Sequence, residues 1–141
     1  MADVHSAEVR SYNMSRIKSK NTKPEIVVRK ALFANGFRFR LHDKKLPGKP
    51  DIVLRKYKTV ILIHGCFWHG HRDCKYFAIP KTRTEWWSNK ITQNQNNDMV
   101  KKQQLIERGW NVIEIFECEL KKERLESTIN ELITNVQNTI L

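Results

Sequence analysis

A short aliphatic segment is the feature of this 141-residue chain that most limits its fold. Residues 60–63 read Val-Ile-Leu-Ile, which is apolar on both faces of an extended strand. Because such a strand needs cover on both sides, we expect residues 59–64 to lie in the centre of a sheet between layers of helices. The segment is also the longest aliphatic run in the chain, far below the roughly 20 residues of a membrane-spanning helix. We therefore expect no membrane partner.

A capping sequence predicts the first helix. Thr22 is followed by Pro24 and Glu25, the pattern of a threonine cap with proline in the first turn and glutamate three residues after the cap. The apolar side chains that follow have helical spacing, and Gly36 provides a glycine stop. We expect a helix between Thr22 and Gly36.

Further strands are expected on both sides of the central one. Alternating apolar and basic residues predict a strand over 37–41, and a loop rich in Pro and Gly leads to a second strand that begins at Asp51. A turn over 55–58 connects this strand to residues 59–64, and residues 110–116 form the last predicted strand.

Two more helices are expected in the second half of the chain. Thr84 is the predicted cap of a long helix that ends at Gly109, although the Asn- and Gln-rich residues 93–97 argue against its continuity. Residues 120–140 form the last predicted helix. The order of helix, three strands, helix, strand and helix predicts an α/β fold with a central mixed sheet flanked by helices.

The domain organisation is expected to be simple. Repeats, low-complexity tracts and linkers are absent from the sequence, so residues 21–141 are predicted to form one domain. Residues 1–20 are polar and basic with scattered apolar side chains, and we expect them to form an arm that becomes ordered on binding. These residues contain no apolar stretch of the secretory kind, which favours a cytoplasmic location.

Basic side chains dominate the first two thirds of the chain. The sequence has 26 Lys and Arg against 15 Asp and Glu, a net charge of +11, of which residues 1–90 contribute +13 and residues 91–141 contribute −2. This excess favours a polyanionic partner, nucleic acid first, because each neutralised phosphate releases counterions. A solvated basic surface without a partner is the alternative.

Three cysteines and a histidine have the spacing of zinc ligands. Cys66, His71 and Cys74 lie close together in the sequence, and Cys118 follows the last predicted strand. Thiolate and imidazole at such spacings suit tetrahedral Zn²⁺, and four protein ligands would close the site, so the ion is expected to be structural. Three unrelated reduced cysteines are the alternative. His69, two residues before His71, is a competing ligand.

Asp51 stands at the start of the second predicted strand, where its carboxylate has no part in apolar packing. An aspartate there is often a turn residue, but Glu25 on the first helix and His64 and His69 after the central strand change its interpretation. A carboxylate can anchor a hard cation, and a histidine can take a proton from water near neutral pH. These groups together are what metal-dependent hydrolysis of a phosphodiester requires.

The motifs around these residues resemble one known family. Asp51, the sequence His-Gly-Cys-Phe-Trp-His at 64–69, Thr-Arg-Thr-Glu-Trp at 82–86 and Asn-Met-Ser at 13–15 are similar to those of the very short patch repair endonucleases. The resemblance covers about residues 10–120. It implies a restriction-endonuclease-like core with a structural zinc loop. It also implies a nick beside the thymine of a T:G mismatch, the lesion left when 5-methylcytosine deaminates.

By position, the resemblance implies roles for individual residues. Asp51 matches the aspartate that binds Mg²⁺, and Ile63 stands where the family often has threonine and uses the backbone carbonyl toward the same ion. His69 matches the general base, and His71 with the three cysteines matches the zinc ligands. Further side chains match groups that contact water at the metal or support the site: His64, Asp98 and Glu25. The usual nuclease triplet of acid, spacer and lysine is absent after Asp51.

Large aromatic side chains flank the expected site. Phe67, Trp68 and Trp86 either pack the zinc loop against the core or stack on bases. The resemblance implies that they wedge into the base stack from the major groove while Met14, on the arm, enters from the minor groove. Because a mismatched step is easier to open than a matched one, wedging favours mismatched DNA.

The combined expectation is a Mg²⁺-dependent endonuclease that nicks duplex DNA at T:G mismatches. We expect a monomer in the bacterial cytoplasm, at the nucleoid when bound to DNA, and aided by mismatch-repair proteins. Two alternatives stay open: a restriction endonuclease that cuts matched duplex, and a non-catalytic zinc-stabilised DNA-binding module. The latter predicts salt-sensitive binding without strand scission.

Overall fold

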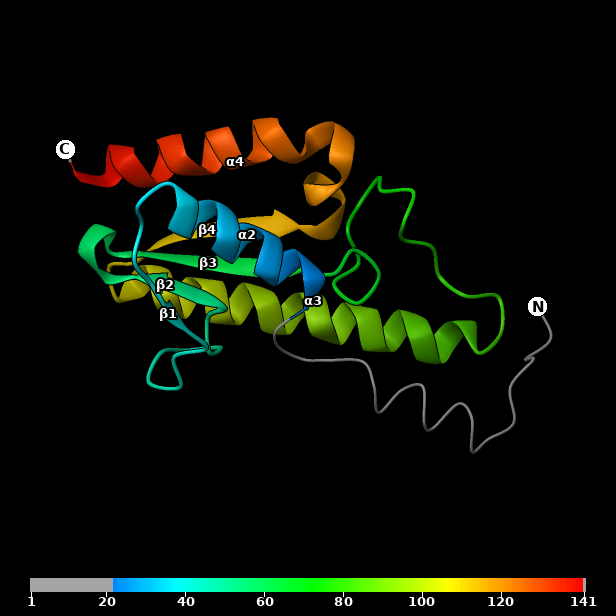
Figure 1. The fold of residues 1–141 in the computed structure, drawn as a ribbon. Coiled ribbons are helices and arrows are strands. Elements are labelled where there is room, and N and C mark those ends of the chain that lie inside the picture. Colours follow the sequence, from blue (N-terminus) through cyan, green and yellow to red (C-terminus); the bar gives the residue numbers. More distant parts are fainter. Residues whose placement is uncertain (1–21, 141) are drawn as a thin grey trace.

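Four strands form one mixed sheet in the order β1-β2-β3-β4 (Figure 1). The computed structural model describes residues 22–140, so the predicted arm and Met14 lie outside the described residues. The strands, in chain order, are Arg40–Leu41, Ile52–Leu54, Thr59–His64 and Asn111–Phe116. The first three pair in antiparallel fashion, and β3 and β4 are parallel. The predicted mixed sheet is therefore confirmed.

Helices cover both faces of this sheet. Helices α2 (Lys23–Ala34) and α4 (Lys122–Gln137) lie on one face, and α3 (Thr84–Glu107) lies on the other (Figure 1). Short 3₁₀ turns follow β2, β4 and α4: Arg55–Tyr57, Glu117–Leu120 and Asn138–Ile140. Within the described residues, none of the helices combines the length and apolarity that a membrane crossing needs.

The central position of β3 follows from its two apolar faces. Ile61 packs with α2 and α4 side chains such as Leu32 and Leu132, whereas Val60 and Leu62 pack with Leu105 of α3. Full burial of each such aliphatic side chain contributes about 1.5–3 kcal/mol. The sequence prediction for this strand is confirmed.

The predicted strand over 37–41 is wrong in its first half. Strand β1 begins only at Arg40, and Phe37 instead closes the turn that follows the preceding helix. Its backbone N–H donates to the carbonyl of Leu32 at 3.0 Å, and its ring is buried in the core. Gly36 makes this ending possible with a φ of +86°. Thr22 caps the helix as predicted, accepting a hydrogen bond from the N–H of Glu25.

Two expectations for α3 are wrong. Thr84 is the first helical residue, and its hydroxyl donates to the carbonyls of Pro80 and Lys81 in the preceding turn instead of capping the helix. The helix is also continuous through residues 93–97. The amides of Asn94 and Gln95 face the loop after β3, and they donate to the backbone carbonyls of Trp68 and Gly70 at 2.8 and 2.9 Å.

Candidate functional site

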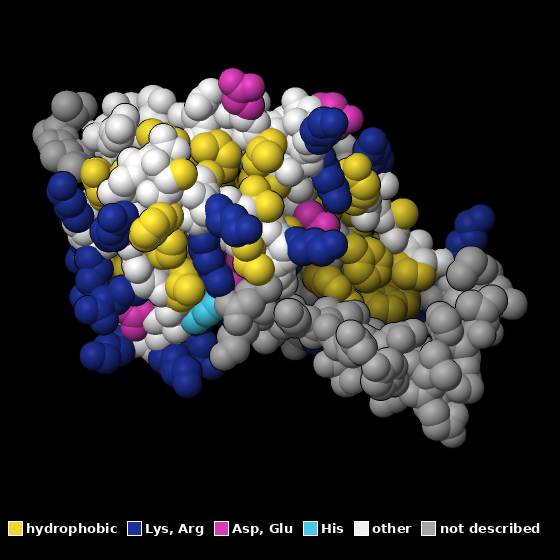
Figure 2. All heavy atoms as spheres, viewed as in Figure 1, with side chains coloured by type: hydrophobic (Ala, Val, Ile, Leu, Met, Phe, Trp, Pro, Cys, Tyr) yellow, Lys and Arg dark blue, Asp and Glu magenta, His cyan; other side chains and the backbone are white. Residues whose placement is uncertain are grey.

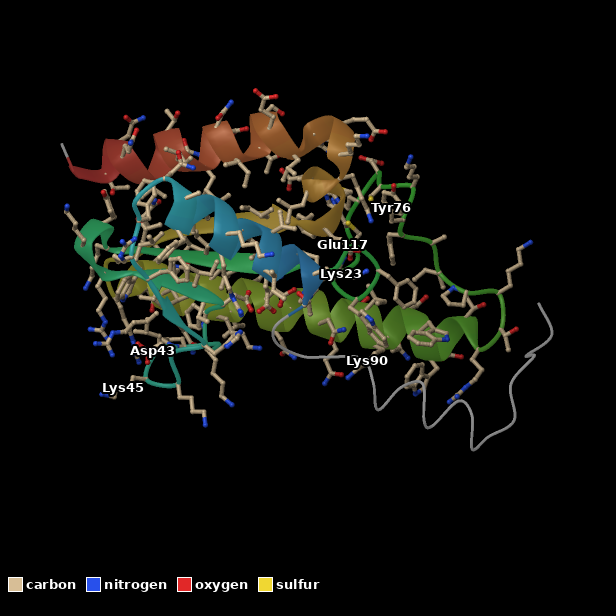
Figure 3. All side chains as sticks on the ribbon, viewed as in Figure 1. Lys23, Asp43, Lys45, Tyr76, Lys90 and Glu117 are labelled. Atoms are coloured by element: carbon tan, nitrogen blue, oxygen red, sulfur yellow. The ribbon has the colours of Figure 1, made fainter. Side chains whose placement is uncertain are left out.

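A cleft of about 950 Å³ lies at the C-terminal end of β3. Residues from α2, β3, α3 and the loop after β3 line it, and a nucleotide-sized ligand fits a cleft of this volume. Figure 3 shows Lys23, from the start of α2, and Glu117, just after β4, at this same end of the sheet. Six of the side chains that line the cleft carry carboxylate or imidazole groups close to one another: Glu25, His42, Asp51, His64, His69 and Asp98.

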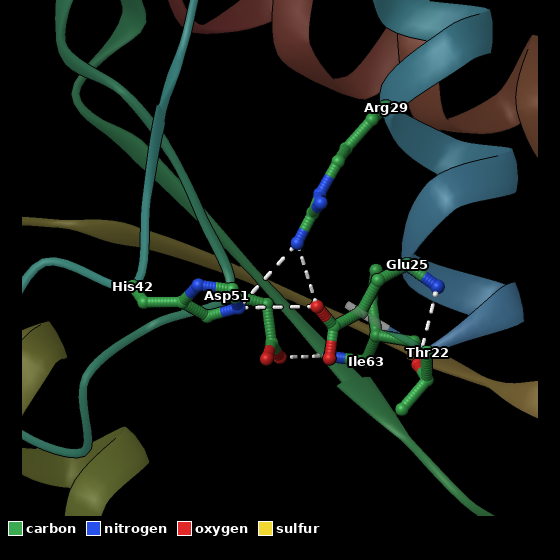
Figure 4. Close-up of polar contacts among 6 residues, drawn as sticks. All are labelled: Thr22, Glu25, Arg29, His42, Asp51 and Ile63. Carbon is green, nitrogen blue, oxygen red and sulfur yellow. Dashed lines mark hydrogen bonds and ion pairs between the residues drawn. The ribbon is translucent and has the colours of Figure 1, made fainter. Parts of the chain in front are cut away.

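Asp51 is held against β3 at the edge of this cleft. Its Oδ2 accepts a hydrogen bond of 2.7 Å from the backbone N–H of Ile63 (Figure 4). The N–H and C=O of one strand residue point to the same side, so the Ile63 carbonyl is directed toward the same edge. Burial raises the pKa of Asp51, and the neighbouring Glu25 carboxylate adds to the increase, whereas the Ile63 N–H opposes it. A bound cation would remove this cost of a buried negative charge.

Glu25 lies beside Asp51 and has two basic neighbours. It is 3% exposed, and its Oε2 lies 2.8 Å from Arg29 Nη2 and 3.1 Å from His42 Nε2 (Figure 4). One ligand atom each from Glu25, His42 and Asp51 fall within 4.8 Å of one another, so the three could hold a metal ion. The sequence analysis missed His42 and Arg29. The signal for His42 is weak, a polar residue directly after the alternating segment 37–41.

Two histidines and an aspartate form a second group in the cleft. His69 Nδ1 lies 2.5 Å from Asp98 Oδ2 of α3, and the His69 ring lies 4.3 Å from the ring of His64. His64 is nearly fully buried, and its Nε2 lies 3.0 Å from Oε2 of Glu114 on β4. The structure thus brings together His64, His69 and Asp98, which the sequence analysis expected in one site. It adds Glu114, which that analysis did not select.

The cysteines gather around His71 in the loop after β3. Ligand atoms of Cys66, His71, Cys74 and Cys118 lie within 4.8 Å of one another. The distance from Cys118 Sγ to His71 Nδ1 is 3.4 Å, close to the value of about 3.5 Å that two ligands of a tetrahedral zinc ion would have. Burial raises the pKa of the Cys66 thiol to about 12, and a cation would instead favour the thiolate. This cluster could bind a metal.

The geometry separates the two histidines that competed for this cluster. His71 stacks on Phe116 at 3.8 Å between ring centroids and directs Nδ1 toward Cys118. His69 contacts Asp98 and belongs to the group in the cleft.

The aromatic side chains that flank the cleft divide into packed and exposed members. Phe67 and Trp68 are half-buried and contact each other and Trp87 at centroid distances of 5.3 to 5.7 Å. Trp86 is 47% exposed, and the Arg83 guanidinium lies 4.9 Å from its ring centroid. Trp87, which packs against both Phe67 and Trp68, was not among the site residues expected from the sequence. Figure 2 shows hydrophobic side chains gathered at the end of the molecule that carries the start of α3.

Basic side chains gather at the opposite end of the face drawn in Figure 2. This end carries the turn between β2 and β3 and the loop between β1 and β2, in which Figure 3 labels Asp43 and Lys45. Asp43 accepts hydrogen bonds from the Lys45 N–H and the Arg55 side chain. An acidic residue thus orders the basic loop.

Comparison with known proteins tests the family resemblance. The family model described as DNA mismatch endonuclease Vsr matches residues 2–76. The type II nicking enzyme V.NmeAIP of Neisseria meningitidis is 46% identical over 141 residues, which cover 99% of this chain and 100% of the relative. The nicking enzyme V.XorIIP of Xanthomonas oryzae is 48% identical, over 85% of this chain and 88% of its own.

The DNA mismatch endonuclease Vsr of Escherichia coli is 44% identical over 126 residues, which cover 89% of this chain and 80% of the relative. These matches extend over the cleft and the cysteine cluster, and they favour an endonuclease over a non-catalytic binding module. The resemblance inferred from the motifs is confirmed. The chain belongs to the DNA mismatch endonuclease Vsr family.

Proposed function

We propose that this endonuclease nicks duplex DNA beside the thymine of a T:G mismatch by Mg²⁺-dependent hydrolysis. The observation that carries the proposal is the meeting of the partly buried Asp51 carboxylate with the His69 and Asp98 pair in one cleft. One group can hold a cation, and the other can accept a proton. This is the minimum set for metal-assisted cleavage of a phosphodiester.

Asp51 and the carbonyl of Ile63 are the groups proposed to hold Mg²⁺. Both offer hard oxygen ligands, which suit this ion, and the raised pKa of Asp51 supports a cation beside it. Bound there, Mg²⁺ supplies Lewis-acid polarisation of the scissile phosphate. Glu25 supports the site as a second carboxylate, and Arg29 and His42 fix its position.

His69 is the proposed general base. Because its Nδ1 faces the carboxylate of Asp98, this nitrogen carries the proton and Nε2 keeps its lone pair. Nε2 takes a proton from the attacking water, and Asp98 then stabilises the imidazolium that forms. His64, whose ring lies against that of His69, is proposed to contact water bound at the metal.

Mismatch recognition is proposed to use the aromatic side chains. The exposed Trp86 is the best placed of the described residues to stack on a base, and Phe67 and Trp68 support it from the loop. Met14 and the arm over residues 1–20 stay a prediction. The basic loop between β1 and β2 supplies phosphate contacts that do not depend on sequence.

The cysteine cluster is proposed to hold a structural Zn²⁺. The donor set of three thiols and one imidazole fits this ion, and its four protein ligands leave no open position for catalysis. The ion would connect the loop after β3 with the end of β4. The restriction-endonuclease-like core, the single nuclease domain over 21–141, the monomeric state, the cytoplasmic location and the help of mismatch-repair proteins also stay predictions.

A nicking assay with Mg²⁺ tests this function. Duplexes that differ only in a T:G or a C:G pair are incubated with the wild-type protein, Asp51→Ala, His69→Ala and the control Glu126→Gln, which changes an exposed residue of α4. We expect one nick in the T:G duplex for the wild type and the control, and none for the two site variants. Equal cleavage of both duplexes would instead support a restriction endonuclease. Undiminished nicking by both site variants would contradict the assigned chemistry.

A further inference from the structure

Glu114 is the one charged residue of strand β4. Strand β4 reads Asn-Val-Ile-Glu-Ile-Phe, and its register pairs Glu114 with Leu62 of β3. Alternate side chains of a strand point to opposite faces, so Glu114 shares the α3 side of the sheet with Val112, which packs beside Leu105. A carboxylate on this inner face needs partners, because a buried unpaired charge is costly.

Two basic side chains each contact one oxygen of this carboxylate. Oε2 lies 3.0 Å from Nε2 of His64, and Oε1 lies 2.7 Å from Nζ of Lys102 on α3. The hydrogen bond to His64 lowers the pKa of Glu114 to about 2, and Lys102 acts in the same direction against the effect of burial. Glu114 is therefore ionised at neutral pH and accepts hydrogen bonds from both sides.

Glu114 lies behind the cleft. His64 is 6% exposed and lines the cleft, and its ring contacts that of His69. Neither Glu114 nor Lys102 is among the described residues that line it. The hydrogen bond to His64 is the contact that links Glu114 to a residue lining the cleft.

We propose that Glu114 is a positioning residue that fixes the orientation and tautomer of His64. An ionised carboxylate only accepts hydrogen bonds, so Nε2 of His64 must direct an N–H toward it. Within residues 22–140, the other ring nitrogen, Nδ1, forms no hydrogen bond and is available to a ligand in the cleft. Lys102 holds the second oxygen and limits rotation of the carboxylate. The proposal rests on the proposed function in one respect, the participation of His64 in nicking.

The kinetic test removes the carboxylate in two ways. Glu114→Ala deletes the acceptor, and Glu114→Gln keeps its size but loses the charge. Loss of a side chain that orients a catalytic group costs about 10–100-fold in activity, so we expect kcat for a T:G duplex with Mg²⁺ to fall by this factor in Glu114→Ala, with KM changed by less than about twofold. Glu107→Gln, an exposed carboxylate on α3, is the control and should match the wild type.

A spectroscopic test needs neither DNA nor Mg²⁺. The Nε2 proton of His64 is buried and hydrogen-bonded, so we expect a slowly exchanging side-chain signal in nitrogen-15 NMR spectra of the wild-type protein. This signal should disappear in Glu114→Ala while the signals of the folded backbone remain. Persistence of the Nε2 proton in that variant, or wild-type kcat, would overturn the proposal.

A double-variant cycle separates this proposal from the function on which it rests. If Glu114 acts through His64, Glu114→Ala should cause no further loss of nicking in the His64→Ala background. Wild-type nicking by His64→Ala would contradict the role of His64 itself and, with it, the role of Glu114. Loss of nicking in His64→Ala together with full nicking in Glu114→Ala would contradict the Glu114 proposal alone.

Discussion

Asp98 on α3 holds Nδ1 of His69 at 2.5 Å, and this contact joins the middle of the long helix to the loop after β3. The carboxylate sets the tautomer of the ring, because it can only accept a hydrogen bond. Asp98→Asn would place an amide there whose N–H₂ favours the opposite tautomer. We expect single-turnover nicking of a T:G duplex to fall about 10²–10⁴-fold in a folded protein.

The exposed Glu126→Gln is the control for this variant, since it also converts a carboxylate to an amide. Nicking by Asp98→Asn within about threefold of that control would contradict the role given to the pair, because proton transfer by a positioned base contributes at least about 10²-fold.

The two histidines of the loop after β3 should differ in their effect on bound zinc. His71→Ala removes a ligand of the cysteine cluster, so we expect the variant to lose its zinc and its thermal midpoint to fall by about 10 °C or more. His69→Ala leaves that cluster intact and should keep one zinc ion per chain while it loses nicking. Metal analysis by mass spectrometry and thermal unfolding measure both effects. Full zinc content in His71→Ala would show that the cluster is not the site.

Trp86 should contribute to affinity for mismatched DNA more than to stability. Nearly half of its surface is exposed, and base stacking on an aromatic ring is worth about 1–3 kcal/mol. We expect Trp86→Ala to weaken binding to a T:G duplex about 5–100-fold, with little change in the thermal midpoint. Phe33→Ala, which removes another exposed aromatic ring beside Arg38, should bind as the wild type does. Equal affinity of the two variants would contradict the stacking role.

The sheet and its flanking helices could be predicted because their signals are local. The apolar faces of residues 59–64, the cap at Thr22 and the glycine stops depend on neighbours in sequence, and the structure confirms them. The strand over 37–41 was predicted too long, since alternation alone does not show that Phe37 closes the preceding helix.

The site could be predicted where a residue type has few structural uses. Cysteines with ligand spacing and a strand-start aspartate stand out in a sequence, whereas the partners His42 and Glu114 do not. Each of these two acts through a contact with a residue at least 17 positions away, which only the folded chain reveals. The Asn- and Gln-rich residues 93–97 misled the prediction for the same reason, because the partners of Asn94 and Gln95 lie in the loop after β3.

Gly70 should be required for the conformation of the loop after β3. Its φ is +59°, and a Cβ at this residue would collide with the side chains of Gln95 and Ile91. Gly70→Ala should therefore lower the free energy of unfolding by about 2–4 kcal/mol and reduce nicking, since His69 is the adjacent residue. Gly36→Ala is the matched control, because its φ is also positive but a Cβ there meets nothing within 4 Å. Chemical denaturation should give a smaller loss, about 1 kcal/mol, for the control. Equal losses would mean that the loop adapts to the extra methyl group.

Because of the ion pair of Glu114, the free energy of unfolding should fall as the solution becomes acidic. Its pKa in the folded protein is about 2, below the ordinary 4.5, chiefly because of the hydrogen bond to His64. Because the folded state favours the charged carboxylate, Glu114 stabilises the protein fully above pH 4.5. This contribution is lost as the pH falls toward 2 and the carboxylate is protonated. Glu114→Gln should therefore be less stable than the wild type by about 1–3 kcal/mol at neutral pH, and the difference should shrink below pH 4.5. Urea unfolding of both proteins across this pH range measures the difference between their free energies of unfolding. Any loss of zinc in acid would affect both proteins alike and would cancel in this difference. A constant difference down to the lowest pH at which both proteins fold would show that the carboxylate charge does not contribute.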